Sequence, residues 1–240
     1  MSPFPLALLL IVLLWSPLMA QERLVLQHDG KVRTVLIDAA PNVRNAPLMI
    51  ALHGGIGGPQ FIRRRAAVTL PRRGWVVAWP AADGEWNDGR RRPNGVPYNR
   101  ADDVGFLRAL VARLAQQGLV DPNRVFVGGI SLGGTMALRV VCEAPDLVRG
   151  AAVALAALPV GLDCPPYGAV PLLLLHGTSD SIMPPGGGRI GGGNFFIRDR
   201  GRVRSITETE TFLAWRNGCT GHRDVGSSRR NRRYRRPIVP

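Results

Sequence analysis

The chain has 240 residues, of which 45% are hydrophobic and 20% are charged. This is enough for one domain with a full core, and the absence of internal repeats and long heptad runs excludes solenoids and coiled coils. The formal net charge is +14, but Lys31 is the only lysine. An excess carried almost wholly by arginine indicates a GC-rich gene more than a binding surface, so we expect no nucleic-acid partner.

The first twenty residues differ from the rest of the chain. An apolar run extends from Phe4 to Trp15, and the polar residues begin at Gln21, after Ala20. The run is shorter than the roughly 20 residues of a membrane span, and its order matches a secretory signal peptide. The absence of early basic residues and the large Leu18 leave an uncleaved anchor or a buried helix as alternatives. We expect residues 1–20 to be a signal peptide, and the mature protein to be secreted (extracellular or periplasmic) without membrane contact.

From residue 24 onward, strand-like and helix-like segments alternate. Period-two apolar residues around Asp29-Gly30 predict an N-terminal hairpin over 24–37, because this dipeptide suits a two-residue turn with positive φ. Apolar residues at helical spacing predict a helix over 102–117. Strands are expected at 47–53, 75–80, 120–129, 150–158 and 171–177. This alternation predicts an α/β fold with a mostly parallel sheet, helices on both faces and ligands at the carboxyl ends of the strands.

The motif Gly-x-Ser-x-Gly occurs at Gly129 to Gly133, with Ser131 at its centre. It lies between a predicted strand and a predicted helix, which is the context of a nucleophile elbow. The small flanking residues let strand and helix approach while the serine hydroxyl points outward. Glycine-rich strand-to-helix turns also occur without catalysis, but here motif and context agree, so we expect Ser131 to be a nucleophile.

Two further strand ends carry candidate residues. The loop HGGIGG at 53–58 follows a strand, and a backbone N–H of Gly55 or Ile56, with that of Leu132, would form an oxyanion hole. His53 in this loop is expected to be structural. Asp180 follows the strand at 171–177, in the position of a triad acid after the serine, although loop aspartates also form turns.

The cysteines number three, at positions 142, 164 and 219. An exported protein can oxidise them, and an odd number leaves one without a partner in the same chain. Cys142 and Cys164 flank one apolar strand and are expected to pair. Cys219 is then the free thiol.

The order of several long motifs resembles the secreted esterases of the polyhydroxybutyrate depolymerase and feruloyl esterase group. The resemblance covers about residues 23–219 and rests on the segments LHGGIGG, WNDGR, ADDVGFLRALVARL, VDPNRVFVGGISLGG, CEAPDLVRGAAVALAAL, LLLLHGTSDSIMPPGGG and TETFLAWRNGC.

This resemblance implies an α/β-hydrolase fold over residues 21–220. It also implies hydrolysis of a polyester or of an aryl or acyl ester through an acyl-enzyme, with no metal and no organic cofactor. Ser131 looks like the nucleophile, Asp180 like the acid, and Trp86 with Asn87 like part of the substrate cleft. Asp102 and Asp103 also match the family, but capping of the helix over 102–117 explains them without chemistry. The oligomeric state cannot be read from the sequence.

The chain departs from this family after Cys219. Members continue into a strand and a glycine-rich loop that carries the catalytic histidine, and here the only histidine after Asp180 is His222. The helix that ends near Trp215 should finish at the far edge of the sheet, and a return strand of about five residues would be needed to reach the serine. RNGCTG lacks the composition of such a strand, so we expect the C-terminal strand to be missing and His222 to be a poor base.

Residues 221–240 contain seven arginines and one aspartate. Such a run is typical of a solvated, disordered tail, and less so of a tail that binds nucleic acid or an anionic membrane. Its composition is also that of a GC-rich gene read out of frame. Two function classes therefore remain: a secreted serine esterase, impaired by loss of its histidine, and an inactive hydrolase-like protein with a binding role or none.

The predicted signal peptide leads to one direct test. N-terminal sequencing of the protein from its native host should give a mature chain that begins near Gln21 and lies outside the cytoplasm. An intact Met1 on a cytoplasmic product would contradict it.

Overall fold

The computed structural model describes residues 20–66, 69–191, 200–220, 222–228 and 232–237. The residues of the predicted signal peptide lie outside these ranges except for Ala20, which begins the first strand. No helix among the described residues is long and apolar enough to cross a membrane.

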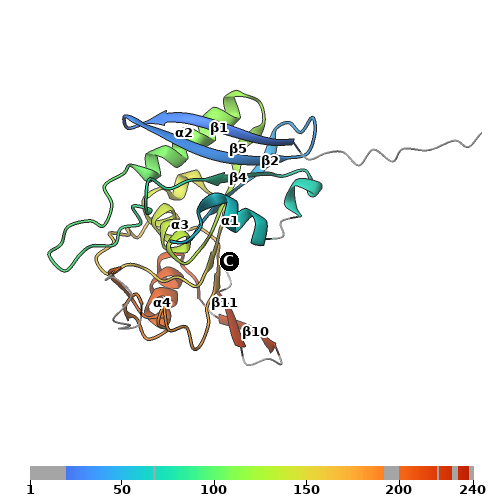
Figure 1. Ribbon diagram of the computed structural model, residues 1–240. Coiled ribbons are helices and arrows are strands. Elements are labelled where there is room, and N and C mark those ends of the chain that lie inside the picture. Colours follow the sequence, from blue (N-terminus) through green and yellow to red (C-terminus); the bar gives the residue numbers. More distant parts are fainter. Residues whose placement is uncertain (1–19, 67–68, 192–199, 221, 229–231, 238–240) are drawn as a thin grey trace, which may run out of the picture.

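The structure is built on a seven-stranded sheet in the order β1-β2-β4-β3-β5-β6-β7 (Figure 1). The first two strands and the β2–β4 pair are antiparallel, and every neighbouring pair from β4 to β7 is parallel. The strands are β1 (Ala20–His28), β2 (Lys31–Ala39), β3 (Ala46–Leu52), β4 (Val76–Pro80), β5 (Val120–Ile130), β6 (Ala151–Ala154) and β7 (Leu172–Leu175). The predicted mostly parallel sheet with an N-terminal hairpin is confirmed.

Helices follow the strands as the periodicity predicts. They are α1 (Gly58–Arg65), η1 (Leu70–Arg73), α2 (Asp103–Gln116), α3 (Leu132–Glu143), η2 (Pro145–Leu147) and α4 (Ile206–Arg216). The short strands β8 (Gly188–Arg189) and β9 (Arg202–Val203) form a separate antiparallel pair. The side chain of Asp102 caps α2 by accepting a hydrogen bond from the backbone N–H of Gly105, as predicted.

The turn between β1 and β2 has the predicted conformation. Asp29 and Gly30 have φ values of 49° and 69°, and the register brings His28 opposite Lys31. Positive φ at both central residues matches the right-handed twist of the strands. This turn therefore fixes which side chains of β2 face the core.

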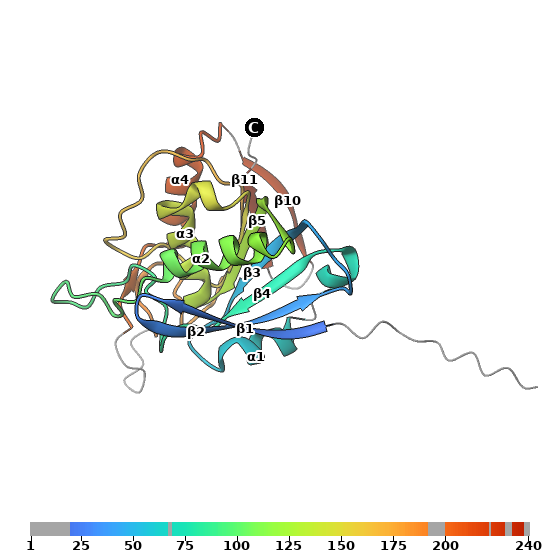
Figure 2. The same cartoon turned by 90° about the horizontal axis from the view of Figure 1, so that it is seen from above.

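Helices cover both faces of the sheet. On one face, α2 and α3 pack on the main core, which includes Phe106, Leu110 and Val140, each 0% exposed. On the other face, a smaller cluster of Leu36, Val77 and Trp79 packs against Ile62 of α1 and Leu70 of η1. Figure 2 shows α2 and α3 on the opposite side of the sheet from α1. At roughly 25 cal/mol per Å² of apolar area, burial on these two faces is the main stabilising contribution.

A disulfide ties α3 to the loop that precedes β7. The bond joins Cys142, the penultimate residue of α3, to Cys164, and Cys219 is free. The predicted pairing is confirmed. Closing a loop of this length removes chain entropy from the unfolded state, worth about 3 kcal/mol in the entropy model.

The C-terminal segment differs from the expected disordered tail. Its strands β10 (His222–Ser228) and β11 (Arg232–Pro237) pair antiparallel, and β11 lies beside β7. The disorder expectation rests on charge and low apolar content, whereas a hairpin needs only backbone pairing, which charged residues permit. Within the described ranges no strand hydrogen-bonds to the free edge of β7, so β10 and β11 are not part of the main sheet.

Thiol titration tests the cysteine arrangement. The denatured, unreduced protein should show one free thiol, at Cys219, and three after reduction. Replacing Cys142 and Cys164 by serine should lower the free energy of unfolding by about 3 kcal/mol, measured by urea titration, whereas Cys219→Ser should change it little. Three free thiols in oxidised, exported material would contradict the pairing.

Candidate active site

Ser131 stands in a strained turn between β5 and α3. Its φ of 54° and ψ of −125° lie outside the regions that ordinary residues favour. Two hydrogen bonds hold it there: its N–H donates to the Ala154 carbonyl oxygen at 2.9 Å, and its carbonyl oxygen accepts from the Thr135 N–H at 2.9 Å. A non-glycine residue in such a conformation persists only where its surroundings impose it, which is typical of functional sites.

The close approach of backbone segments around this turn explains why glycines flank Ser131. A Cβ on Gly133 would lie 2.2 Å from the Leu52 carbonyl oxygen and 2.4 Å from that of His53. A Cβ on Gly129 would lie 2.1 Å from the carbonyl oxygen of Gly133. Glycine is therefore required at both positions for β3, β5 and α3 to meet. The geometry is that of the predicted nucleophile elbow.

The loop after β3 lies beside Ser131. A Cβ on Gly54 would lie 3.5 Å from the Ser131 Cβ, and one on Gly55 would lie 2.9 Å from Cδ1 of Leu132. Leu132 is the first residue of α3, where backbone N–H groups have no partner within the helix. The structure thus brings together the predicted oxyanion residues Gly55 and Leu132 at a helix N-terminus, which favours negative charge.

Asp180 lies at the same edge of the sheet, two strands away from the serine. Its carboxylate accepts hydrogen bonds from the N–H groups of Ile182 and Met183, both at 2.9 Å. Between the two, Leu155 leaves β6 with a φ of 52° and donates its N–H to the Leu175 carbonyl oxygen. Asp180 therefore forms its own turn, and one of its carboxylate oxygens has no hydrogen bond within the described residues.

His53 is structural, as expected. Its Nδ1 donates to the Gly54 carbonyl oxygen at 2.6 Å, and its Nε2 accepts from the Ala82 N–H at 3.1 Å. This pair of bonds requires the neutral ring, and burial lowers the pKa of His53, which acts in the same direction. With both ring nitrogens occupied, His53 has no nitrogen left to serve as a base.

The structure gives Trp86 a different place from the predicted substrate cleft. Its side chain is 1% exposed, and its indole N–H donates to the His53 carbonyl oxygen at 2.9 Å. Its ring also lies 5.1 Å from the His53 ring. An indole buried in the core cannot contact substrate. Trp86 instead stabilises the start of the Gly54–Gly55 loop through its hydrogen bond to His53. The sequence motif alone cannot distinguish these two roles, because both require a tryptophan near the same loop.

Asn87 is likewise engaged with the protein. Its side-chain amide donates to the Ala101 carbonyl oxygen at 2.8 Å, and its backbone N–H donates to the Asp103 carboxylate at 2.7 Å. Asp103 is fully buried and forms an ion pair with Arg33 at 2.7 Å. Asp103 therefore holds the Asn87 loop against β2, whereas the sequence indicated only helix capping for it. Its buried partner Arg33, 70 residues away, was not foreseen.

A histidine that the sequence analysis passed over lies beside Asp180. His176 follows β7 directly, and burial lowers its pKa while the charge of Asp180 acts to raise it. Its Nε2 is buried and has no hydrogen-bond partner among the described groups. Of the remaining histidines, His28 contacts Asp102 at 2.9 Å, on the N-terminal hairpin, and His222 begins β10. No described histidine hydrogen-bonds to Ser131 or Asp180 in this structure.

A set of charged side chains adjoins the oxyanion loop. Arg90 is buried and contacts Asp88 at 2.7 Å and Glu85 at 3.1 Å. Its Nη1 donates to the backbone carbonyl of Arg200 at 2.5 Å. The side chain of Arg200 lies 3.4 Å from Glu85. These contacts hold the 85–90 loop and residue 200 together next to Gly55.

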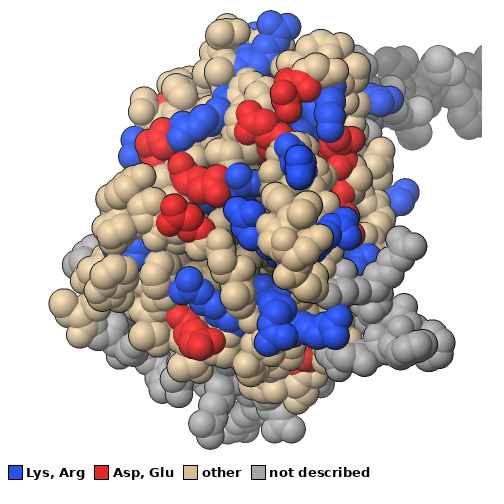
Figure 3. All heavy atoms as spheres, turned by 90° about the vertical axis from the view of Figure 1, so that its left-hand side faces the viewer, with Lys and Arg blue, Asp and Glu red and all other residues tan. Residues whose placement is uncertain are grey.

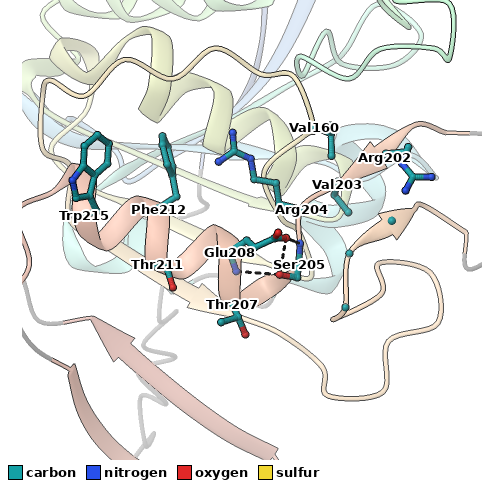
Figure 4. Close-up of a pocket in the computed structure, with 13 residues that line it drawn as sticks. Val160, Arg202, Val203, Arg204, Ser205, Thr207, Glu208, Thr211, Phe212 and Trp215 are labelled. Atoms are coloured by element: carbon teal, nitrogen blue, oxygen red, sulfur yellow. Dashed lines mark hydrogen bonds between the residues drawn. The ribbon is translucent and has the colours of Figure 1, made fainter.

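A cavity of about 900 Å³ among the described residues is not at the serine. It lies along α4 and β9, lined by residues such as Phe212, Trp215 and Arg204 (Figure 4). Neither Ser131 nor Asp180 lines it. The elbow, where strain, helix N-terminus and loop coincide, is therefore the candidate site, and this cavity is not part of it.

Comparisons with known proteins agree with this geometry. Residues 63–159 match the model of the prolyl oligopeptidase family. The chain is 30% identical over 162 residues to a protein named as an esterase, NocK, of Nocardia uniformis subsp. tsuyamanensis, covering 65% of this chain and 47% of that protein. It is 29% identical over 190 residues to feruloyl esterase B of Piromyces equi, covering 73% of this chain and 33% of that protein.

The chain has the α/β-hydrolase fold. A solved thermostable esterase has the same fold, with a TM-score of 0.57 and 18% identity over 82% of this chain and 51% of that one. This α/β-hydrolase spans less than half the length of either curated relative.

Substitution at the elbow tests the close approach in this α/β-hydrolase. Gly133→Ala should destabilise it by about 1–3 kcal/mol or more, because the added methyl meets backbone carbonyl oxygens that cannot move aside. Gly186→Ala is the control, since a Cβ there meets nothing within 4 Å. Thermal unfolding followed by circular dichroism measures both, and equal melting temperatures would contradict the geometry.

Proposed function

We propose that this α/β-hydrolase hydrolyses carboxylic esters through an acyl-enzyme on Ser131, and that it is a secreted enzyme of the polyhydroxybutyrate depolymerase and feruloyl esterase type. The observation that carries this proposal is the strained Ser131 turn, with Gly55 and Leu132 beside it. The relatives' names, esterase and feruloyl esterase, support the same chemistry.

The reaction would proceed in two steps. The Ser131 hydroxyl attacks the ester carbonyl, and the developing oxyanion accepts hydrogen bonds from the N–H groups of Leu132 and Gly55. The alcohol leaves, and water then hydrolyses the acyl-serine. A serine hydroxyl is a weak nucleophile without a base to take its proton, so both steps depend on a nearby proton acceptor.

Exposed aliphatic side chains on the loops that follow β3, β6 and β7 fit an apolar acyl or alcohol group. Ile56 of the oxyanion loop is 77% exposed, Ile182 next to Asp180 is 53% exposed, and Leu155 is 36% exposed. Exposed aliphatic side chains of this size gather where apolar ligands bind. A short polyester segment or an aryl ester offers matching apolar surface.

We expect the hydrolysis of esters by this chain to be slow. His53 has both ring nitrogens in hydrogen bonds, the His176 Nε2 is buried, and His28 lies on the N-terminal hairpin. Losing the triad histidine costs about a millionfold in kcat in the subtilisin case, so only residual turnover from the oxyanion hole and binding is expected.

Hydrolysis of p-nitrophenyl butyrate tests the proposal. The chain should release p-nitrophenol slowly but above the uncatalysed rate, and Ser131→Ala should abolish this excess because no other group forms the acyl-enzyme. Asp180→Asn should lower the rate less than Ser131→Ala. The absorbance of p-nitrophenolate at constant pH is the readout.

Two results would contradict parts of the proposal. An excess rate that survives Ser131→Ala would place the chemistry elsewhere. A fast turnover, with a kcat near the 10 per second typical of enzymes, that disappears in His222→Ala would identify His222 as the base and refute the impairment.

A further inference from the structure

The guanidinium of Arg200 contacts the oxyanion loop. A Cβ built on Gly55 would lie 2.5 Å from Arg200 Nη1 and 2.9 Å from Leu132 Cδ1. The cation therefore fills the space that a side chain at position 55 would occupy, next to Gly55 and Leu132, the two residues proposed to supply the oxyanion N–H groups. Arg200 reaches this place from the segment before β9, far from the elbow in sequence.

Arg200 is positioned but not fully engaged. Buried Arg90 holds its backbone carbonyl, and its side chain remains 32% exposed. Its contact with Glu85 is 3.4 Å, longer than the 2.7–2.9 Å typical of a charge-assisted hydrogen bond. The Glu85 carboxylate also forms an ion pair with Arg90, with 3.1 Å between Oε2 and Nη2. Among the described residues, a carboxylate on a ligand can therefore approach the Arg200 guanidinium without displacing a strong ion pair.

Further arginines continue from Arg200 away from the serine. One cavity of about 390 Å³ is lined by Arg200 and Arg92 among others, and an adjoining cavity of about 450 Å³ shares Arg92 and adds Arg91, Arg189 and Arg202. No Asp or Glu is among the described residues that line the second cavity. The face seen in Figure 3 carries both basic and acidic side chains. Asp83 and Glu85 also line the first cavity, so the positive potential belongs to the second cavity, around Arg92 and Arg202.

We propose that Arg200, with Arg92 and Arg202 behind it, is an anion subsite for a carboxylate carried by the substrate itself. The site would select esters whose acyl part ends in a free carboxylate, such as monoesters of dicarboxylic acids or acid-terminated oligoesters. This rests on the proposed esterase function and names its substrate class. A guanidinium presents several N–H donors in one plane, which suits a carboxylate better than a neutral carbonyl.

A matched pair of substrates tests the subsite. Monoethyl adipate and ethyl hexanoate have acyl chains of equal length and differ in the terminal carboxylate. The chain should prefer monoethyl adipate by about tenfold in kcat/KM, and Arg200→Gln should remove this preference by lowering kcat/KM for monoethyl adipate about tenfold more than for ethyl hexanoate. Ethanol release is the readout, and the preference should fall with added salt.

Two variants control for charge and for folding. Arg44→Gln removes the same charge from the exposed loop before β3, at the amino end of the sheet, and should keep the preference. Arg200→Lys retains a cation and should keep part of it, whereas a purely structural role for Arg200 would not distinguish the two esters. Equal loss with both esters in Arg200→Gln would overturn the proposal, as would an unchanged preference.

A binding measurement separates this proposal from the esterase proposal. In the Ser131→Ala background, calorimetric titration should give a dissociation constant for monoethyl adipate about tenfold weaker after Arg200→Gln is added. If neither ester is hydrolysed but this shift appears, the esterase function fails and the subsite stands. If hydrolysis occurs but binding is insensitive to Arg200, the subsite is refuted and the esterase function stands.

Discussion

The contact of Gly133 with the carboxyl end of β3 is the constraint on which the site depends. Because no side chain intervenes, the first turn of α3 packs directly on the Leu52 and His53 carbonyls. That contact forces Ser131 into its strained conformation and fixes the start of α3 beside the Gly54–Gly55 loop. The nucleophile, the helix N-terminus and the second oxyanion residue are thus placed by one backbone approach, with the cost of the strain offset by packing in the core.

The buried polar residues extend this constraint outward. The Trp86 indole N–H holds the His53 carbonyl, and Asp103 joins the Asn87 loop to Arg33 of β2. Buried charges are tolerated when paired and hydrogen-bonded. Arg33 Nη2 meets this condition through Asp103 and the Ala81 carbonyl oxygen, whereas Arg33 Nε has no hydrogen-bond partner among the described residues. These contacts hold the loop next to the oxyanion site in place. Arg90 holds residue 200 in place in a similar way, by donating a hydrogen bond to its backbone carbonyl oxygen.

Local sequence patterns predicted most of the fold and the elbow. Short-range chemistry predicts the Asp29-Gly30 turn, the apolar strands and Ser131. The pairing of the two cysteines was predicted because they flank a single apolar strand. The roles of Trp86, Asp103 and Arg200 could not be predicted in this way. Each depends on contacts between segments that are distant in sequence, and a tryptophan or arginine in a motif does not reveal whether it faces the core, a loop or the substrate. The hairpin at residues 222–237 was missed because charge composition does not report backbone pairing.

The central proposal is that Ser131 forms the acyl-enzyme and that none of His28, His53 and His176 is placed to act as its base. Mass spectrometry of the chain quenched during reaction with p-nitrophenyl butyrate tests it most directly, because the activated leaving group needs no protonation. The account predicts one butyryl group on the peptide that contains Ser131, accumulating because deacylation is slow. A butyryl group on another residue, or rapid turnover with no accumulated acyl-serine, would contradict it.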